Sequence, residues 1–521
     1  MNLDRRALLK ATGQLAIFAG LSSQAGWAAP LASYPFTLGI ASGDPAPDGF
    51  VLWTRLAPRP LEPGSGMPMK VVAVQWQVAE DSAFTRIVRS GEAAARPELG
   101  HSVHIEVAGL QPSRPYWYRF VAGADMSPAG TVRTAPAPGA PVDRVRIGLA
   151  GCQNYAAGYF TAYRHLAEES DLDAIFHYGD YIYEGGADSG CPKINGKPAC
   201  VRLHDGDELY SLDAYRRRYA LYKLDSDLQA AHRAAAFLST YDDHEVDNNW
   251  AGAWDQDGTP PEIFLLRRYA AMQAWYENMP VRRAQLPAAG QIQMFRRIDY
   301  GDLLRVHLLD TRQYRTDQPC EPQEKTACRP ATNRSSVQII GTAQEKWLGQ
   351  GMSPAFRWNL LAQQVMVMPF TYPGTRAAGT ANLDSWNGYP EARARLIASI
   401  QARRLSNVVI ATGDVHKHHA GVLPSRPDDL SSAPVATEFV GSSISSGGDG
   451  SDMPTGWDRA LADNPHTKLV SDRRGYQLFD IGRKEWRTDV IAVDRVSTHD
   501  GARRTIASFV TVPERPGLEL G

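Results

Sequence analysis

Side chains that could bind metal ions or move protons follow four short apolar segments of this chain. The four groups are Cys152-Gln153-Asn154, Gly179-Asp180-Tyr181-Ile182-Tyr183-Glu184, Asp242-Asp243-His244-Glu245 with Asp247-Asn248-Asn249, and Gly413-Asp414-Val415-His416. Each group alone has an ordinary explanation, since Gly-Asp after a strand usually makes a turn and an unpaired cysteine is usually a small buried hydrophobe. The acid-rich group could be a solvated loop or a helix N-terminus, and His416 a hydrogen-bonded core histidine. Four such groups in corresponding positions are much less expected by chance than one.

Together these side chains make a set of metal ligands. The thiolate of Cys152, the phenolate of Tyr183 and the imidazole of His416 suit a small, highly charged transition ion such as iron(III). Carboxylates and an amide suit a hard ion such as calcium, magnesium or manganese. The ligands of this second kind are Asp180, Asp243, Asp414 and Asn249. With Asp180 as the natural bridge, two adjacent ions could hold the attacking and leaving oxygens of a phosphoryl displacement and lower the pKa of bound water.

The elements that must position these groups belong to an α/β region. From residue 144 onward apolar strands alternate with helical segments. The predicted strands are 145–150, 174–177, 237–241, 303–309, 360–368, 408–411 and 438–441. In open α/β sheets, ligands bind beyond the carboxyl ends of the strands, where the four groups fall. We therefore predict a catalytic domain over residues 144–515.

The region before it is predicted to be all-β. Residues 34–134 contain short segments of alternating polarity, and the stretch from Gly109 to Phe120 is similar to the tyrosine corner of immunoglobulin- and fibronectin-type sandwiches. Acids and histidines do not cluster there, so we assign this domain no chemistry. The proline-rich segment 135–143 is predicted to be a semi-rigid linker.

The first 28 residues have the order of an export signal. Arg5-Arg6 precede a mildly apolar run, and Gly26-Trp27-Ala28 offers a small-x-small cleavage site. The arginine pair is similar to that of twin-arginine signals, which are read by the translocon that exports folded proteins. The alternative, a membrane anchor, conflicts with an apolar run shorter than the ~20 residues of a spanning helix. We predict a periplasmic or secreted protein with no stable membrane span.

Cysteine spacing bears on the compartment of the protein, and net charge bears on the class of ligand it binds. Cys191 and Cys200 flank one short loop and Cys320 and Cys328 another, which suits local disulfides in an oxidising compartment, while Cys152 is left over. The formal net charge is -2 and the chain has no long basic run, which argues against a nucleic-acid complex. A small phosphoester substrate remains compatible with this charge, since a bound cation can supply the positive potential.

At these motifs the chain resembles the alkaline phosphatase D (PhoD) family of metallophosphoesterases. Further matching segments are Ala41–Pro45, Val51–Arg55 and Leu309–Arg315. The resemblance implies a calcineurin-like metallophosphatase β-sandwich flanked by helices behind the small all-β domain. It also implies iron(III) with calcium, activity on phosphomonoesters and phosphodiesters, and twin-arginine secretion.

The resemblance also implies roles for individual residues. The implied iron ligands are Cys152, Asp180, Tyr183 and His416, and the implied calcium ligands are Asp180, Asp243, Asn249 and Asp414. The motif leaves open whether Asp242 or Asp243, and Asn248 or Asn249, points inward. The chain departs from the usual pattern at Gly151 and at Lys417-His418-His419, and neither departure removes a ligand.

Three further side chains are candidates for contact with the phosphate. His244 is the candidate proton donor or phosphate ligand, the alternative being a helix-capping surface histidine. Arg216 or Arg218 could bind phosphate through its guanidinium, the alternative being a solvated helix face.

Two other classes of function compete with this interpretation of the sequence. A serine esterase or sulfatase is disfavoured because neither G-x-S-x-G nor C-x-P-x-R occurs. The rival to a phosphoesterase is a catalytically inactive periplasmic binding or scaffold protein with the same fold.

Overall fold

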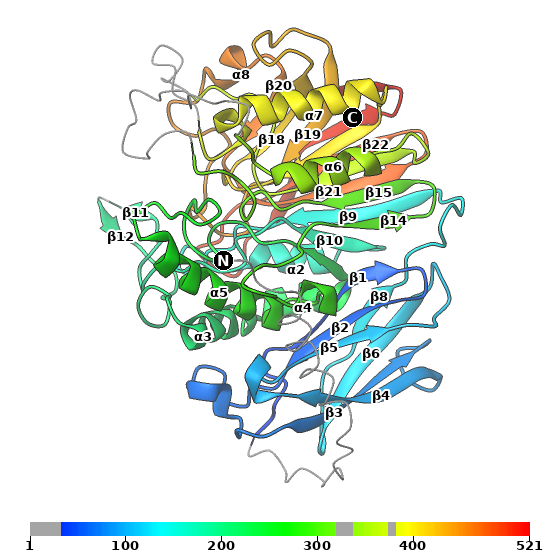
Figure 1. Ribbon diagram of the computed structural model, residues 1–521, viewed down its shortest axis with the longest axis vertical. Coiled ribbons are helices and arrows are strands. Elements are labelled where there is room, and N and C mark those ends of the chain that lie inside the picture. The colour runs from blue at the N-terminus through cyan, green and yellow to red at the C-terminus, as the bar shows by residue number, and fades with distance from the viewer. Residues whose placement is uncertain (1–32, 195, 319–336, 373–381) are drawn as a thin grey trace, which may run out of the picture.

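The computed structural model describes residues 33–194, 196–318, 337–372 and 382–521, and two large sheets dominate it (Figure 1). The larger sheet has ten strands, with β9, β10 and β13 parallel to one another at its centre. In spatial order the strands are β24 (Arg515–Leu520), β23 (Arg503–Val512), β22 (Trp486–Val493), β21 (Arg474–Gly482), β9 (Arg144–Ala150), β10 (Ala174–His177), β13 (Ala236–Ser239), β1 (Ile40–Ala46), β2 (Gly49–Arg55) and β5 (Ser102–Val107).

The second sheet has seven strands and packs face to face on the first. In spatial order they are β14 (Arg296–Tyr300), β15 (Leu304–Leu308), β16 (Trp358–Ala362), β17 (Val408–Thr412), β19 (Pro434–Val440), β18 (His418–Pro424) and β20 (Thr467–Ser471). Ile147, Leu149 and Phe176 of the first sheet share one buried cluster with Leu360 and Val409 of the second. Apolar side chains on both inner faces thus form the core of a β-sandwich.

Helices cover the two outer faces of this sandwich (Figure 1). Four pack on the ten-stranded sheet: α2 (Thr161–Ala167), α3 (Leu212–Lys223), α4 (Ser226–Ala234) and α5 (Pro261–Asn278). On the seven-stranded sheet lie α6 (Gly341–Gly351) and α7 (Pro390–Ala402), and α8 (Ala460–Asp463) contacts β20. Short 3-10 helices are η2 (Pro63–Gly66), η3 (Pro97–Leu99), η4 (Arg283–Gln285) and η6 (Trp386–Gly388). The predicted metallophosphatase sandwich with flanking helices is confirmed.

The N-terminal region is all-β, but it is not a separate unit. A five-stranded sheet packs on β1, β2 and β5 and comprises β3 (Val72–Ala79), β4 (Ile87–Ala95), β6 (Pro115–Ala122), β7 (Asp125–Met126) and β8 (Gly130–Arg133). Tyr116 makes the expected corner, its hydroxyl accepting from the Gln111 amide at 3.1 Å. The other face of this sandwich consists of strands that continue the central ten-stranded sheet, because β1 pairs with β13 at Gly43 and Phe237.

Two local features explain this junction. A Cβ at Gly43 would lie 2.1 Å from the Pro280 carbonyl oxygen, so only glycine allows β1 to approach this closely. The predicted linker is fixed at both ends: the Ala135 amide donates to Ala46 at 3.0 Å, and the Ala140 carbonyl accepts from Asp302 at 2.9 Å. Segment 135–143 therefore runs over the surface of a continuous structure.

The local disulfide prediction can be checked at one of its two pairs. Cys191 and Cys200 are bonded at 2.06 Å around the small hairpin β11 (Lys193–Ile194) and β12 (Lys197–Pro198), and Cys152 is free and buried. Cys320, Cys328 and the predicted signal lie outside the described residues. Among the helices that the structure describes, none is long and apolar enough to cross a membrane.

Candidate metal centre

The four predicted groups of ligands converge at one end of the sandwich. Three follow the carboxyl ends of the parallel neighbours β9, β10 and β13, and the fourth follows β17 in the facing sheet. Residues of the last three groups border a cavity of about 470 Å³, and Cys152 lies buried behind it. Its lining residues are Asp180, Asp243, His244, Asn248, Asn249, Tyr372, Asn382, Asp414, Val415 and His416. The volume lies within the range usual for small-molecule sites.

The backbone at this edge of the sheets adopts positive φ angles at most of the predicted ligand positions. Five of the seven predicted ligands have left-handed φ angles between 52° and 69°. They are Cys152, Asp180, Asn249, Asp414 and His416. Side chains other than those of glycine, asparagine and aspartate rarely adopt this conformation, which costs roughly 1–3 kcal/mol for other residue types and clusters at functional sites. The turn leaving each strand is thus shaped to aim a side chain toward the other predicted ligands.

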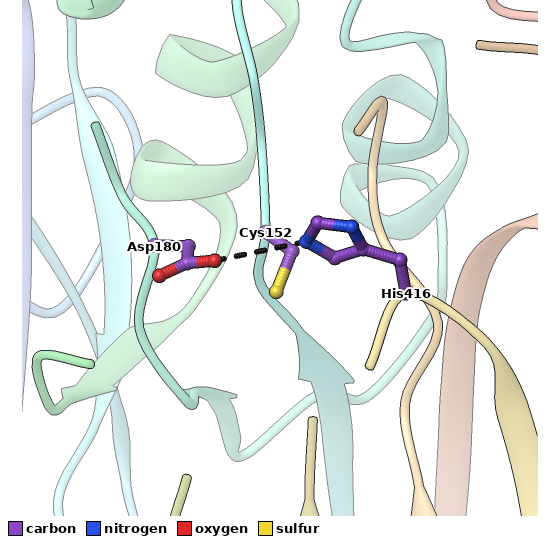
Figure 2. Close-up of side chains that lie close together, drawn as sticks. All are labelled: Cys152, Asp180 and His416. Carbon is purple, nitrogen blue, oxygen red and sulfur yellow. Dashed lines mark ion pairs between the residues drawn. The ribbon is translucent and has the colours of Figure 1, made fainter. Parts of the chain in front are cut away.

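The softer ligands gather around one point. The sulfur of Cys152, a carboxylate oxygen of Asp180 and a ring nitrogen of His416 lie within 4.8 Å of one another, and Figure 2 shows the three side chains facing each other. The Tyr183 hydroxyl is 2.9 Å from Asp180 Oδ2 and 3.0 Å from His416 Nε2. Thiol, phenol, carboxylate and imidazole thus meet, as the sequence predicts.

The protonation of this group reflects its burial. Burial, followed by repulsion from Asp180, raises the pKa of the Cys152 thiol, and the same two causes raise the pKa of the Tyr183 phenol. Burial and nearby positive charge lower the pKa of His416 to about 3. A metal ion binding here would therefore displace protons from sulfur and phenol but find the imidazole already neutral.

The harder ligands form an adjoining cluster. Oxygens of Asp242, Asp243 and Asp414 lie within 4.8 Å of one another, as do ligand atoms of Asp180, Asp243 and His244. Asp243 lines the cavity, whereas Asp242 turns away to pair with the wholly buried Arg312. Of this acidic pair it is therefore Asp243 that faces inward. Asn248 and Asn249 both border the cavity.

One guanidinium serves several of these acids. Arg312 lies 3.0 Å from Asp414, 3.5 Å from Asp243 and 2.7 Å from Asp384. Burial raises the pKa of Asp414, as does repulsion from Asp384. Burial alone would also raise the pKa of Asp243, but Arg312 and His244 outweigh it and lower that pKa.

Asp180 completes this electrostatic pattern. Burial and the neighbouring Asp243 raise the pKa of Asp180 to about 7. Buried acids that raise the pKa of one another favour an additional cation.

Two observations test whether the residues fit a hard ion. Asp243 Oδ1 is buried and accepts no hydrogen bond. One end of the Asn249 side-chain amide lies 3.1 Å from Asp243 Oδ2 and 3.2 Å from Asp384 Oδ2, where its nitrogen would donate to both carboxylates. Rotating that amide would offer its oxygen beside the same carboxylates, which is a donor set suited to calcium. The residues present fit the implied ion.

His244 lies beside Asp180 and Asp243 and lines the cavity. Its Nδ1 is 2.8 Å from Glu184 Oε2, and Glu184 Oε1 accepts from the Asn248 amide at 2.8 Å. The imidazole packs against the Tyr183 ring with centroids 4.1 Å apart. Burial would lower the pKa of His244, but Glu184, Asp243 and Asp180 raise it well above its ordinary value. These carboxylates therefore favour the protonated form of the imidazole, which lines the cavity.

Comparison with known proteins identifies the family. The model of the PhoD-like phosphatase family matches residues 147–490, and that of the PhoD-like phosphatase N-terminal domain matches residues 21–136. This chain belongs to the PhoD-like phosphatase family. Alkaline phosphatase D of Bacillus subtilis (strain 168) is 43% identical over 524 residues, covering 99% of this chain and 88% of the relative. The solved structure of PhoD has a TM-score of 0.90 at 43% identity, covering 95% of this chain and 93% of that one. The protein is a phosphoric ester hydrolase.

Two predicted phosphate contacts of this PhoD-like phosphatase do not reach the cavity. Arg216 pairs with the buried carboxylate of Glu277 at 2.6 Å and donates to the Glu98 carbonyl at 2.9 Å, at the contact with the N-terminal strands. Arg218 donates to the backbone carbonyls of Tyr183 and Gly185, the latter at 2.8 Å. Neither arginine borders the cavity, and neither lies on a solvated face. Arg218 instead holds the backbone that carries Tyr183.

Several residues around the centre were missed from the sequence. Arg312 belongs to a segment noticed only for its resemblance to the family, and Asp384 is an isolated acid with no motif around it. The Ser446 hydroxyl oxygen lies 2.7 Å from the Tyr183 hydroxyl and 2.7 Å from the Cys152 carbonyl oxygen. Tyr372 reaches the cavity from a loop. The two serine pairs on either side of Ile444, Ser442-Ser443 and Ser445-Ser446, are the one sequence signal that points to Ser446.

Proposed function

We propose that this PhoD-like phosphatase is a metal-dependent enzyme that cleaves small phosphomonoesters, phosphodiesters or both, in the periplasm or outside the cell. The observation that carries the proposal is the convergence of Cys152, Asp180 and His416 within 4.8 Å, with Tyr183 in contact with two of them. A purely structural role does not account for a thiol, a phenol, an imidazole and several carboxylates meeting beside an open cavity.

The metals are proposed to be iron(III) and calcium, with manganese or magnesium as substitutes for calcium. Iron would be held by Cys152, Asp180, Tyr183 and His416, and calcium by Asp180, Asp243, Asn249 and Asp414. When bound, such ions supply a nucleophile from water at neutral pH and neutralise the charge of the phosphate. The uncompensated acids of the cavity support this assignment.

The protein's own groups then orient the substrate and handle its leaving group. His244, held by Glu184 at 2.8 Å and charged, can donate a proton from Nε2 to the departing ester oxygen. Glu184 fixes the ring so that Nδ1 carries a proton as well, and the Asn248 amide fixes Glu184 in turn. Arg216 and Arg218 bind other groups of the protein, and no arginine is among the described residues that line the cavity.

Export through the twin-arginine translocon is also part of the proposal. Arg5-Arg6, the short apolar run and the small-x-small site support it. The disulfide between Cys191 and Cys200 is in keeping with an oxidising compartment. Export after folding would let the chain bind its metals before it crosses the membrane.

The test uses full-length protein purified after export. We expect hydrolysis of p-nitrophenyl phosphate or bis(p-nitrophenyl) phosphate, iron and calcium by elemental analysis, and loss of turnover on chelation that the ions restore. Full activity in metal-free protein would refute the metal assignment. A folded, metal-loaded protein that cleaves no phosphoester would instead favour the inactive binding or scaffold alternative, which family membership does not favour.

A further inference from the structure

One aromatic side chain lies between the two sheets beside the candidate metal centre. Tyr178 is the first residue after β10 and stands two positions before Asp180. Its side chain is buried in the apolar cluster that fills the space between the sheets, together with Cys152. Cys152 and Asp180 follow strands of the ten-stranded sheet, whereas His416, which faces them in Figure 2, follows β17 of the seven-stranded sheet. The separation of the sheets at this point therefore decides whether these ligands meet.

Three glycines make room for the Tyr178 ring. Gly151, Gly413 and Gly441 are the first residues after β9, β17 and β19, so both sheets contribute. A Cβ at Gly151 would lie 2.3 Å from the ring, one at Gly413 2.2 Å and one at Gly441 2.7 Å. Real Cβ atoms do not come this close to other heavy atoms, and none of the three has a positive φ angle that would by itself favour glycine. These positions therefore require glycine because the ring occupies the space.

Hydrogen bonds connect the same side chain to the backbone that carries the ligands. The Tyr178 hydroxyl donates to the Ser442 carbonyl, and the Ser442 hydroxyl donates to the His416 carbonyl at 3.1 Å. On the side of the ten-stranded sheet, the Cys152 amide donates at 3.0 Å to the carbonyl of Gly179, the residue that follows Tyr178. A displacement of the ring would therefore move the turns that carry Cys152 and His416.

We propose that Tyr178 is a positioning residue that sets the separation of the two sheets at the proposed metal centre. The inference rests on the proposed function and adds to it a residue that is neither a candidate ligand nor part of the cavity lining. Gly151 and Gly413 directly precede the candidate ligands Cys152 and Asp414, so the ring contacts the chain one residue away from each. Because protein interiors are close-packed and transmit strain, a change in the size of this spacer would displace ligands on both sheets.

The test measures iron binding, which a role confined to the hydrophobic core would leave unchanged in folded protein. Protein purified after export is stripped of metal by chelation and titrated with iron(III) nitrilotriacetate, and the visible band expected from a phenolate bound to iron(III) is recorded. Tyr178→Leu and Gly413→Ala should each weaken iron binding by about 10- to 100-fold and shift the band. The three nearest atoms that a Cβ at Gly413 would meet all belong to Tyr178, so this position isolates the contact.

Two further variants test the spacer by its size. In the double variant Tyr178→Leu with Gly413→Ala, the added methyl group fills space that the ring has left. The double variant should therefore bind iron more tightly than either single variant, because the two positions are in contact and their effects are not additive. Tyr178→Phe keeps the ring and loses only the hydroxyl, so its affinity for iron should stay within about 10-fold of that of the wild type.

Gly148→Ala is the matched control. Gly148 also lies on β9, but a Cβ there would meet Leu166 Cδ1 of α2 at 2.8 Å and not the Tyr178 ring. We expect this variant to unfold at a lower temperature and to bind iron with an unchanged dissociation constant.

The outcomes separate this inference from the proposed function. Iron binding equal to that of the wild type in folded Tyr178→Leu and Gly413→Ala would overturn the inference and leave the metal assignment intact. A double variant that binds iron no more tightly than the single variants would also overturn it, and this comparison can be made with whichever single variant folds. Wild-type protein that binds no iron would instead refute the proposed metal assignment, and the inference with it.

Discussion

Two buried clusters of charge in this protein are built on opposite principles. At the contact between α3, α5 and the N-terminal strands, Arg55 donates to the carbonyl of Gly100 and to the Ser65 hydroxyl, each at 3.0 Å. Beside it, Arg216 binds both oxygens of Glu277, at 2.7 and 2.6 Å. Every nitrogen of these two guanidiniums has a hydrogen-bond partner within the protein, so the two arginines are satisfied as they stand.

The cavity shows the reverse. Arg312 faces the carboxylates of Asp242, Asp243, Asp384 and Asp414, and oxygens of Asp242 and Asp243 are buried with no hydrogen bond. A region selected for stability alone would not retain so much uncompensated charge. We infer that the ionic groups at the N-terminal contact stabilise the fold, whereas those at the strand ends serve to bind ligands.

The largest expected effect comes from removing the shared ligand. Asp180→Asn should lower kcat/KM for a phosphoester by about 1000-fold or more, since both proposed ions lose a carboxylate that supplies several kcal/mol of transition-state stabilisation. The unfolding temperature of the metal-free variant should be equal to or above that of the wild type, because one buried negative charge is gone. A variant that is inactive because it unfolds would contradict the contrast between the two clusters.

Glu277→Gln should lower stability and leave turnover unchanged, which is the opposite of the effect expected for Asp180→Asn. Removing the carboxylate partner of Arg216 leaves a buried guanidinium uncompensated, and we expect the free energy of unfolding to fall by about 3 kcal/mol in chemical denaturation. Turnover by the folded fraction should match the wild type. Replacing both partners, in Arg216→Met with Glu277→Leu, should recover most of the lost stability. A large fall in kcat for Glu277→Gln would show that this contact also serves the active site.

Ser446→Ala is a finer probe of the proposed iron ligands. Phenolate bound to iron(III) should give a visible charge-transfer band, which Tyr183→Phe should abolish. Since Ser446 lies 2.7 Å from the phenol oxygen, its removal should shift that band and weaken iron binding by about 10- to 100-fold. Ser445→Ala, the neighbouring serine, whose hydroxyl donates to the Asn154 carbonyl at 2.7 Å and not to Tyr183, is the matched control. An iron-loaded protein with no such band would exclude Tyr183 as a ligand.

The smallest expected effect is a loss of folding stability at acidic pH, which arises from His104 at the N-terminal contact. His104 Nε2 lies 2.9 Å from the Tyr276 carbonyl oxygen, and burial lowers the pKa of His104 to about 4. Between pH 6.5 and 4 the unfolded chain binds a proton that the folded chain does not, so stability falls as the pH falls through this window. The contribution at pH 5.5 is on the order of 1 kcal/mol. Denaturation at pH 7 and 5.5 should show a smaller difference in His104→Gln than in the wild type.

The ligands of the proposed centre could be foreseen because they follow strands. An apolar strand is recognisable locally, and parallel strands bring their carboxyl ends to one edge. This reasoning located Cys152, Asp180, Asp243 and Asp414. It could not locate Asp384 or Tyr372, which come from loops whose path depends on the whole fold. It also wrongly made Arg216 a candidate for phosphate contact. Arg216 pairs with Glu277 on α5, and this pairing cannot be predicted from the sequence of α3 alone.

The same distinction holds for the fold. Hydrophobic patterns predicted an α/β region behind N-terminal strands, and the family resemblance supplied the sandwich. The seven strands predicted between residues 145 and 441 each overlap a strand of the structure. The strands β14, β18 and β20 to β24 and the small hairpin β11–β12 were not predicted. The joining of β1 to β13 depends on pairing between residues almost two hundred positions apart, at Gly43 and Phe237, which local periodicity does not encode.

The left-handed turns that present Cys152 and His416 have a consequence for how such a chain could be altered. Glycine at either position would relax the backbone and stabilise the fold, while the chain lost a donor atom. Screening for thermal resistance alone would therefore favour variants that are sturdier and inert. Stabilising substitutions in this enzyme should therefore avoid the left-handed turns that carry ligands and be placed elsewhere, for example in the N-terminal strands.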